Sequence, residues 1–91
     1  MKLIFRQHAI RRMFERRISV EDVEAVLAGG RIIESYPDDT PYPSALSLGY
    51  VGNRPIHVVS ATGDAGERII ITVYEPDSAL WSADFSERKR P

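Results

Sequence analysis

The sequence predicts a single α+β domain in which two N-terminal helices pack on a three- to four-stranded antiparallel sheet. Hydrophobic residues recur with the period of a helix up to residue 28 and with the period of a strand from residue 31 to residue 75. A run of helices followed by a run of strands is typical of helices packed on one face of an antiparallel sheet. The chain has 91 residues, which suits one small domain, so we expect a single domain over residues 1–85 and a flexible charged tail over residues 86–91.

The first helix is expected over residues 6–17, and its side chains divide between two faces. One face is apolar and is expected to pack on the core; it consists of Ala9, Ile10, Met13 and Phe14. The other face carries His8, Arg12 and Arg16, which we expect to be exposed to solvent. A short strand over residues 3–5 is compatible with the sequence that precedes this helix.

The second helix is expected over residues 19–28, with Ser19 as its N-cap. Asp22 stands three positions later, so the two side chains can form a capping box. Gly29 and Gly30 follow the last apolar residue, and they predict that the helix ends with a residue in the left-handed conformation.

The remaining sequence alternates with a period of two and predicts four strands, over residues 31–36, 44–51, 55–61 and 68–75. The proline-rich residues 37–43 are expected to form a loop. In the last strand we expect one face to carry Arg68, Ile70, Thr72 and Tyr74, and the other to carry Ile69, Ile71 and Val73. Residues 78–85 are expected to form a short helical turn that packs Leu80 and Trp81 back on the domain. The sheet face opposite the helices would then be free to bind a ligand.

Charge is distributed unevenly along the chain. The first seventeen residues contain six lysine or arginine side chains and one acidic side chain, Glu15, whereas the whole chain has a net charge of −1. Such asymmetry indicates an anionic partner. Arg11, Arg12 and Arg16 are the candidate phosphate-binding residues, because guanidinium groups bind phosphate with two hydrogen bonds and stay charged. The alternative is an ordinary solvated helix face that pairs with nearby acids.

Composition and motifs exclude several classes of site. The chain has no cysteine, so it contains neither disulfides nor thiolate metal sites. It has no apolar run long enough to cross a bilayer, and its N-terminus is charged too early for a secretory leader, so we expect a cytoplasmic protein that does not engage membranes. The phosphate-binding loop, the dinucleotide-binding loop and the serine-hydrolase elbow are all missing. We therefore assign no cofactor and no metal.

Three side chains are candidates for acid–base chemistry: His8, His57 and Tyr74. A histidine beside arginines is favoured in its neutral form and can move a proton near neutral pH. His57 lies within an apolar strand, and the simpler interpretation is a semi-buried histidine with satisfied hydrogen bonds. Tyr74 ends the last strand and can hydrogen-bond to an oxyanion or stack on a base, although such tyrosines commonly just cap a core.

Several segments together resemble a widespread bacterial and archaeal family, the domain of unknown function number 4258. The resemblance covers about residues 6–81, and its motifs are His8-Ala9-Ile10-Arg11-Arg12-Met13, Glu15-Arg16-Arg17-Ile18-Ser19, Gly30-Arg31-Ile32-Ile33-Glu34, Tyr36-Pro37-Asp38-Asp39-Thr40-Pro41-Tyr42-Pro43-Ser44, Pro55-Ile56-His57-Val58-Val59 and Ile71-Thr72-Val73-Tyr74-Glu75-Pro76-Asp77. This family is similar to the RelE-like toxins, which are small α+β ribonucleases found in type II toxin–antitoxin pairs.

The resemblance implies an endoribonuclease of the mRNA interferase type that needs no metal. The ribose 2′-hydroxyl would attack the adjacent phosphate and leave a cyclic phosphate. Its implied partners are RNA, free or ribosome-bound, and a small antitoxin protein; a homodimer is left open. The family's polar motifs correspond to His8, Arg12, Arg16, His57 and Tyr74. We expect His8 or His57 to act as base or acid, the arginines to bind phosphate, and Tyr74 to position the RNA.

Two rivals to this hypothesis remain open. One is a non-catalytic module that binds RNA or an acidic protein through its arginines, and the other is a structural subunit of a heterodimer. The ribonuclease hypothesis requires the arginines and both histidines to converge on one pocket.

Overall fold

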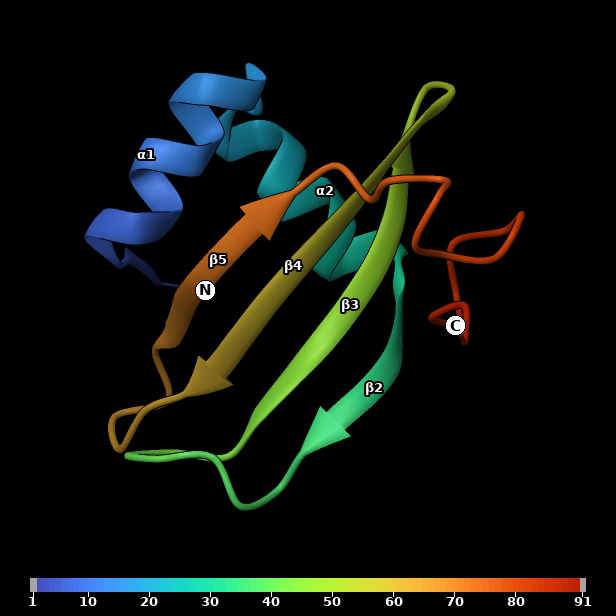
Figure 1. Ribbon diagram of the computed structural model, residues 1–91. Helices are drawn as coiled ribbons and strands as arrows, with labels where there is room; N and C mark the ends of the chain where they lie inside the picture. Colours follow the sequence, from blue (N-terminus) through green and yellow to red (C-terminus); the bar gives the residue numbers. More distant parts are fainter. Residues whose placement is uncertain (1, 91) are drawn as a thin grey trace.

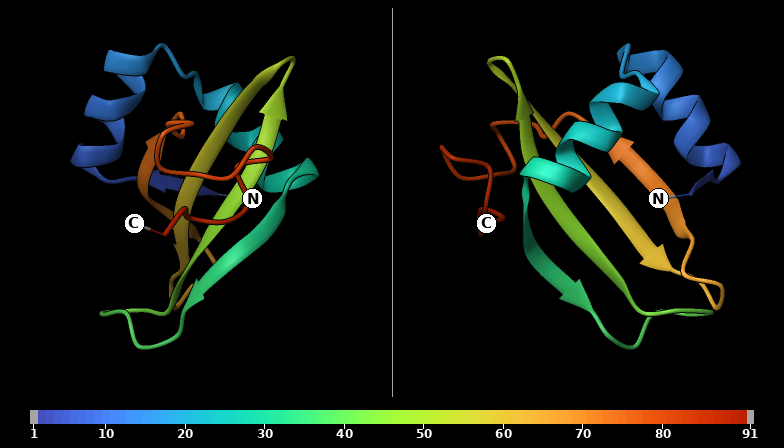
Figure 2. Two further views of the ribbon diagram at one scale, coloured as in Figure 1. Left: turned by 45° about the vertical axis from the view of Figure 1, so that its right-hand side comes forward. Right: turned by 180° about the vertical axis from the view of Figure 1, so that it is seen from behind.

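Two helices cover one face of a five-stranded sheet, and the C-terminal segment (residues 76–90) lies on the other face (Figures 1 and 2). The computed structural model describes residues 2–90; Met1 and Pro91, at the ends of the expected domain and tail, lie outside that range. The helices are α1 (Gln7–Arg16) and α2 (Val20–Gly29). The strands are β1 (Leu3–Phe5), β2 (Arg31–Tyr36), β3 (Ser44–Val51), β4 (Arg54–Thr62) and β5 (Arg68–Tyr74). The predicted α+β class and the order of these elements are confirmed.

The sheet is mixed, with strand order β1-β5-β4-β3-β2. β1 pairs in parallel with β5, whereas β2, β3, β4 and β5 pair antiparallel with one another. The expected sheet of three or four antiparallel strands was therefore incomplete. The short strand over residues 3–5 is present, but with only three residues it has no periodicity from which its partner or direction could be predicted.

α1 packs on the sheet through a narrower face than expected. Ala9 and Met13 are buried, but Ile10 is 55% exposed and Phe14 is 88% exposed. α1 lies over β5, near one edge of the sheet (Figure 1). Ile10 and Phe14 each follow a buried residue and so point about 100° further round the helix. The prediction that these two side chains pack on the core was wrong, because α1 packs on β5 through Ala9 and Met13.

α2 begins with the capping box that the sequence predicts. The Ser19 hydroxyl accepts a hydrogen bond from the Asp22 backbone N–H, and the Asp22 carboxylate accepts one from the Ser19 N–H, both at 3.0 Å. The predicted left-handed residue at its end is not found at Gly30, whose φ of −87° is extended. It is α1 that ends with a left-handed residue, Arg17, whose φ is 54°. Each helix has ten residues, and neither is long and apolar enough to cross a bilayer.

The main core lies between the helices and the sheet. Gly49 of β3 lets α2 approach closely, since a Cβ there would lie 3.0 Å from the Cα of Val26. The core consists of Ala9, Met13, Ile18, Val23, Val26, Ile56, Val58, Ile70 and Val73. Burial of these side chains supplies the main driving force for folding.

A β-bulge changes which side chains of β5 share a face. Val59 pairs with Thr72 but Ser60 pairs with Ile70, so Ile71 is an extra residue in β5. The bulge reverses the alternation, and Ile70 and Val73 both reach the core on the helix side. Tyr74 and Thr72 remain together on the opposite side, as predicted, but Arg68 and Ile70 do not share their face.

The sheet face opposite the helices is partly covered, contrary to the prediction that it is free. The expected short helical turn is confined to the start of residues 78–85, where the Leu80 and Trp81 N–H groups both donate to the Asp77 carbonyl, and the rest is irregular. Trp81 is buried, as expected, whereas Leu80 is 49% exposed. Trp81 forms a β-bridge with Arg88, and the Lys89 N–H donates to the Leu80 carbonyl. The left view of Figure 2 shows this segment in front of the sheet, on the side away from α2. Flexibility of residues 86–91 stays a prediction.

Candidate functional site

His57 lies on the covered face of the sheet and is fully buried. Its Nε2 is 2.9 Å from the Phe85 carbonyl oxygen, and its Nδ1 is 3.1 Å from the Tyr74 hydroxyl. A carbonyl can only accept a hydrogen bond, so Nε2 carries the hydrogen and donates it to Phe85. In the neutral ring Nδ1 is then an acceptor, and the Tyr74 hydroxyl donates to it. This tautomer of His57 is inferred from the hydrogen-bond partners of its two ring nitrogens.

Two aromatic rings enclose His57. Its ring centroid is 4.4 Å from that of Trp81 and 5.2 Å from that of Tyr74, and both pairs are edge-to-face. Burial lowers the pKa of His57, and the Phe85 carbonyl and the Glu34 carboxylate oppose this effect less strongly. His57 is therefore neutral at neutral pH. Both ring nitrogens have hydrogen-bond partners, which confirms the interpretation of His57 as a histidine with satisfied hydrogen bonds.

Tyr74 connects this buried ring with the surface. Its side chain is half-buried, and burial is the main cause that raises the pKa of its phenol. Tyr36 and Glu34 raise this pKa further, while Arg88 lowers it. The phenol is consequently protonated at neutral pH, and its hydrogen points to His57.

The outer side of Tyr74 lines an open cavity of about 410 Å³ between α1, the end of β5 and the C-terminal segment. Arg12 and Arg16 enter it from α1, and Arg88 enters from the C-terminal segment. The lining residues are Arg12, Arg16, Thr72, Tyr74, Glu75, Asp77, Leu80, Trp81 and Arg88. This arrangement brings three cationic side chains to the same cavity as the Tyr74 phenol.

The cavity's two carboxylates already have partners. Glu75 pairs with Arg54 at 2.8 Å, and the Asp77 carboxylate accepts a hydrogen bond from the Ala79 N–H, also at 2.8 Å. Within residues 2–90, neither of the two ion pairs involves Arg12, Arg16 or Arg88. The three guanidinium groups thus keep their charge available for an anion.

Arg54 also fixes the end of α1 from which Arg16 extends. Its guanidinium donates hydrogen bonds to the carbonyl oxygens of Arg16 and Arg17. A cation at the C-terminus of a helix stabilises it, because the last carbonyls are unpaired and carry partial negative charge. The same side chain therefore neutralises Glu75 and anchors the α1 end of the cavity.

The structure brings together only some of the residues that the sequence singled out. Arg12, Arg16 and Tyr74 line the cavity, and His57 lies directly behind Tyr74. His8 and Arg11 are exposed on α1 and do not belong to the lining. The two histidines therefore do not converge on one pocket, because His57 is buried beneath Tyr74 and Trp81.

Sequence reasoning missed Arg88, which lies far from α1 in the sequence. Its guanidinium carbon is 5.7 Å from the centroid of the Trp81 ring, a distance suited to a cation–π contact. The sequence placed Arg88 in a charged tail, and the only hint of a different position was Trp81, a large apolar residue that needs burial.

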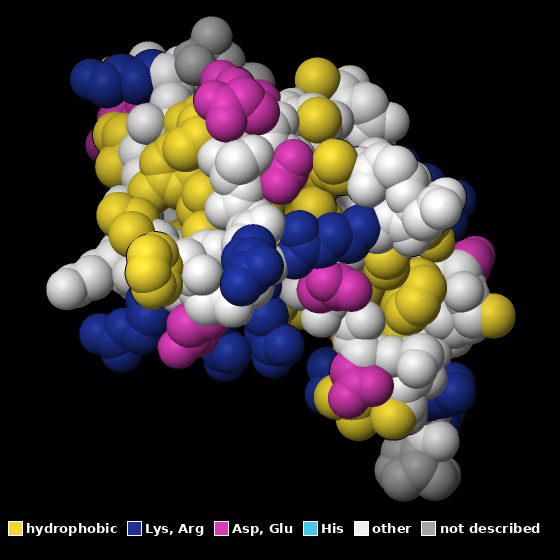
Figure 3. Space-filling model, turned by 90° about the horizontal axis from the view of Figure 1, so that it is seen from above, with side chains coloured by type: hydrophobic (Ala, Val, Ile, Leu, Met, Phe, Trp, Pro, Cys, Tyr) yellow, Lys and Arg dark blue, Asp and Glu magenta, His cyan; other side chains and the backbone are white. Residues whose placement is uncertain are grey.

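The surrounding surface is not uniformly basic. Figure 3 looks down on the molecule from above and shows lysine and arginine side chains beside acidic ones, with hydrophobic side chains exposed between them. Both signs of charge are therefore mixed on this face, in keeping with the net charge of −1.

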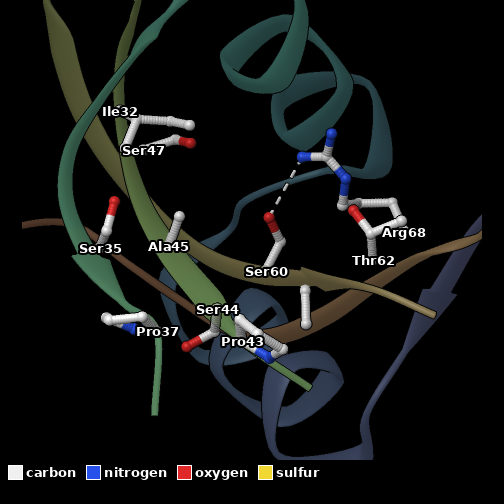
Figure 4. A pocket seen from close by; sticks show the side chains of 11 residues that line it. Ile32, Ser35, Pro37, Pro43, Ser44, Ala45, Ser47, Ser60, Thr62 and Arg68 are labelled. Carbon is white, nitrogen blue, oxygen red and sulfur yellow. Dashed lines mark hydrogen bonds between the residues drawn. The ribbon is translucent and has the colours of Figure 1, made fainter. Parts of the chain in front are cut away.

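A second cavity, of about 310 Å³, lies on the helix side of the sheet (Figure 4). Its lining is rich in small hydroxyl side chains, among them Ser35, Ser47 and Ser60, and Arg68 donates to the Ser60 hydroxyl at 3.3 Å. This cavity contains no histidine or carboxylate and so has no group suited to acid–base chemistry. Among residues 2–90, no cluster of three or more histidines and carboxylates is arranged to hold a metal ion.

A model of the family described as Domain of unknown function (DUF4258) matches residues 5–75 of the chain. Searches of curated proteins and of solved structures found no match. The matched range includes Arg12, Arg16, His57 and Tyr74, but it ends before Trp81, Phe85 and Arg88.

Proposed function

Since the chain belongs to the family Domain of unknown function (DUF4258), whose description names no activity, we propose from the cavity itself that it is a ribonuclease that cleaves RNA without a metal, and the toxin of a type II toxin–antitoxin pair. The observation that carries the proposal is the group of guanidiniums of Arg12, Arg16 and Arg88, which line the same cavity as the Tyr74 phenol and take part in no ion pair within residues 2–90. The resemblance to RelE-like toxins belongs to the same proposal.

The arginines would bind the scissile phosphate. A phosphodiester carries one negative charge, and the developing transition state carries more, so fixed cations at this position stabilise the transition state over the substrate. Arg16 is anchored through its carbonyl by Arg54, and Arg88 is held against Trp81. Such support reduces the entropy lost when the phosphate is bound.

Tyr74 would move the proton of the ribose 2′-hydroxyl. The phenol oxygen accepts this proton while the phenol hydrogen passes to Nδ1 of His57, 3.1 Å away. The 2′-oxygen then forms a bond to phosphorus, the bond to the 5′-oxygen breaks, and the leaving oxygen takes a proton from water. The imidazolium returns its proton through the Tyr74 hydroxyl to the hydroxide left by that water, which restores neutral His57 and the phenol. The products are a 2′,3′-cyclic phosphate and a 5′-hydroxyl.

This scheme changes the roles expected of the histidines. His57 is fully buried and serves as a proton acceptor behind Tyr74 rather than by contact with RNA. His8 is exposed outside the cavity lining, and the scheme gives it no role. Tyr74 replaces both as the group that touches the substrate.

The alternative is an RNA-binding module without catalysis. One observation favours it: neither histidine lines the cavity, so acid–base chemistry rests on one phenol whose pKa is raised by burial. Binding alone needs only the three arginines. The two hypotheses differ in whether Tyr74 matters for turnover.

Cleavage of a short RNA labelled at its 5′-end, with chelator present, tests the proposal. We expect a product that ends in a cyclic phosphate, and no cleavage of the same sequence made with 2′-deoxyribose. Arg12→Ala and Arg16→Ala should each lower the rate at least about 10-fold. Arg11→Ala is the matched control, because Arg11 lies on the same helix outside the cavity lining.

Binding that depends on Arg12 and Arg16 without any cleavage would favour the binding module. Equal effects of Arg11→Ala and Arg12→Ala would argue against this cavity as the binding site, because only Arg12 lines it.

A further inference from the structure

The C-terminal segment, residues 76–90, contributes directly to the surroundings of His57, although it follows the residues 5–75 that match the family. Trp81 packs edge-on against the imidazole, and the Phe85 carbonyl accepts its Nε2–H. The ring's two hydrogen-bonding nitrogens thus have partners from two different parts of the chain, Tyr74 from β5 and Phe85 from the segment.

Phe85 adopts a backbone conformation that is unusual for its residue type. Its φ is 62°, and Arg17 is the only other residue besides glycine with positive φ among residues 2–90. Arg17 is explained as the residue that ends α1, whereas Phe85 lies in an irregular segment. The left-handed conformation is unfavourable for an ordinary residue because its Cβ crowds the following carbonyl oxygen, so the surrounding structure must hold it in place.

Asp84 supplies that support. Its carboxylate accepts hydrogen bonds from the Ser82 hydroxyl, the Ser86 hydroxyl and the Ser86 N–H, at 2.7 to 3.1 Å. These bonds lower the pKa of Asp84 to about 2, so the carboxylate is ionised throughout the neutral range. The Phe85 N–H also donates to the Ser82 carbonyl at 2.8 Å.

We propose that Phe85 is a positioning residue whose left-handed backbone directs its carbonyl to Nε2 of His57 and so fixes the tautomer that receives the Tyr74 hydrogen. With the hydrogen on Nε2, Nδ1 accepts from Tyr74. The lone pairs of the phenol oxygen are then free to accept a proton from a ligand in the cavity.

The opposite tautomer would reverse the direction of this hydrogen bond. With the hydrogen on Nδ1, His57 would donate to the Tyr74 oxygen, and the phenol would present its hydrogen to the cavity. Phe85 therefore determines whether Tyr74 acts toward a ligand as an acceptor or as a donor. The consequence for catalysis rests on the proposed ribonuclease function, but the tautomer itself does not.

Two substitutions of Phe85 by side chains of similar size both remove the aromatic ring. A difference between them therefore reports the backbone conformation at this position. Asparagine tolerates the left-handed region, whereas the β-branched valine strongly disfavours it. Phe85→Asn should retain the wild-type tautomer, and Phe85→Val should not. The readout is the ¹⁵N chemical shifts of the His57 ring nitrogens, from long-range proton–nitrogen spectra at neutral pH.

We expect the wild type and Phe85→Asn to show a protonated Nε2 and an unprotonated Nδ1. Phe85→Val should show averaged shifts or a protonated Nδ1, and its RNA cleavage should fall at least about 10-fold below that of Phe85→Asn. Wild-type ring shifts in a folded Phe85→Val protein would overturn the proposal. If the wild type does not cleave RNA, the proposed function fails, but the ring shifts still decide the role of Phe85.

Asp84→Ala provides a second test if Phe85→Val does not fold. It removes the carboxylate that holds residues 82–86 and leaves Phe85 intact. A mixed or reversed tautomer in this variant supports the proposal, and an unchanged tautomer contradicts it.

Discussion

The Tyr74 hydroxyl donates a hydrogen bond to Nδ1 of His57, and the two residues are direct partners across β5 and β4. Side chains at paired positions of antiparallel strands lie on the same face of the sheet. The pairing therefore fixes a short proton path between an open cavity and a buried ring. In the proposed function this path supplies the acid–base group, since no histidine lines the cavity.

Tyr74→Phe removes the hydroxyl at the cavity end of this path. We expect RNA cleavage to fall at least about 100-fold, while RNA affinity stays within a few-fold because the arginines remain. Initial rates and equilibrium binding with the same labelled RNA measure the two effects separately. In a bacterial host, induced wild-type protein should arrest growth, and this variant should not.

Tyr42→Phe is the matched control for that substitution. The Tyr42 hydroxyl donates a hydrogen bond to the Asp64 carboxylate at 3.2 Å, and Tyr42 lies outside the cavity lining. The control should leave the cleavage rate nearly unchanged. A Tyr74→Phe protein as active as Tyr42→Phe would rule out proton transfer through the phenol.

The stability of the protein should decrease on mild acidification because of His57. Burial lowers the folded-state pKa of His57 below its ordinary value of 6.5, so the unfolded chain binds a proton more readily than the folded one. The stabilising contribution is complete above the unfolded pKa of 6.5 and is lost as pH falls through the folded pKa. Urea unfolding between pH 7.5 and 5 measures it.

His57→Gln tests whether this histidine is the cause. Glutamine cannot titrate in that range, so the decrease in unfolding free energy below pH 6.5 should become shallower in the variant. The groups that face the ring are Tyr74, Trp81, the Phe85 carbonyl and, at longer range, Glu34. An equally steep decrease in His57→Gln would assign the effect to other groups.

The parts of the fold that depend on local sequence were predicted well. The capping box of Ser19 and Asp22 requires residues only three positions apart, and it is present. The strands over residues 31–36 and 44–51 also follow from period-two alternation and proline-rich boundaries. Signals of this kind depend only on residues close together in the sequence.

The features that failed depend on contacts between distant residues. The bulge at Ile71 inverted the faces of Arg68 and Ile70, and period-two alternation cannot reveal an inserted residue. The burial of His57 depends on Trp81 and Phe85, more than twenty positions later in the sequence. The cavity could be predicted only in part, because Arg12 and Arg16 signal it by charge, whereas Arg88 reaches it through irregular structure.

Ser19→Ala should lower the free energy of unfolding by about 1 kcal/mol, because it leaves the Asp22 N–H without its capping acceptor. Thermal or urea unfolding at pH 7 measures the difference. Ser19→Thr keeps a hydroxyl at the same position and should stay within a few tenths of a kcal/mol of the wild type. Similar losses in both variants would show that the side chain contributes through packing rather than through the capping box.

Arg88→Met should weaken RNA binding by removing one of the three guanidiniums that line the cavity. Each phosphate contact with single-stranded RNA contributes a slope of about −0.7 to the dependence of log affinity on log salt concentration. The variant's slope should therefore be shallower by about this amount. Arg90→Met is the matched control, because Arg90 is exposed in the same segment but does not line this cavity. If Arg90→Met changes the slope as much as Arg88→Met does, the segment contributes only general positive charge, and the cavity's third guanidinium has no specific role.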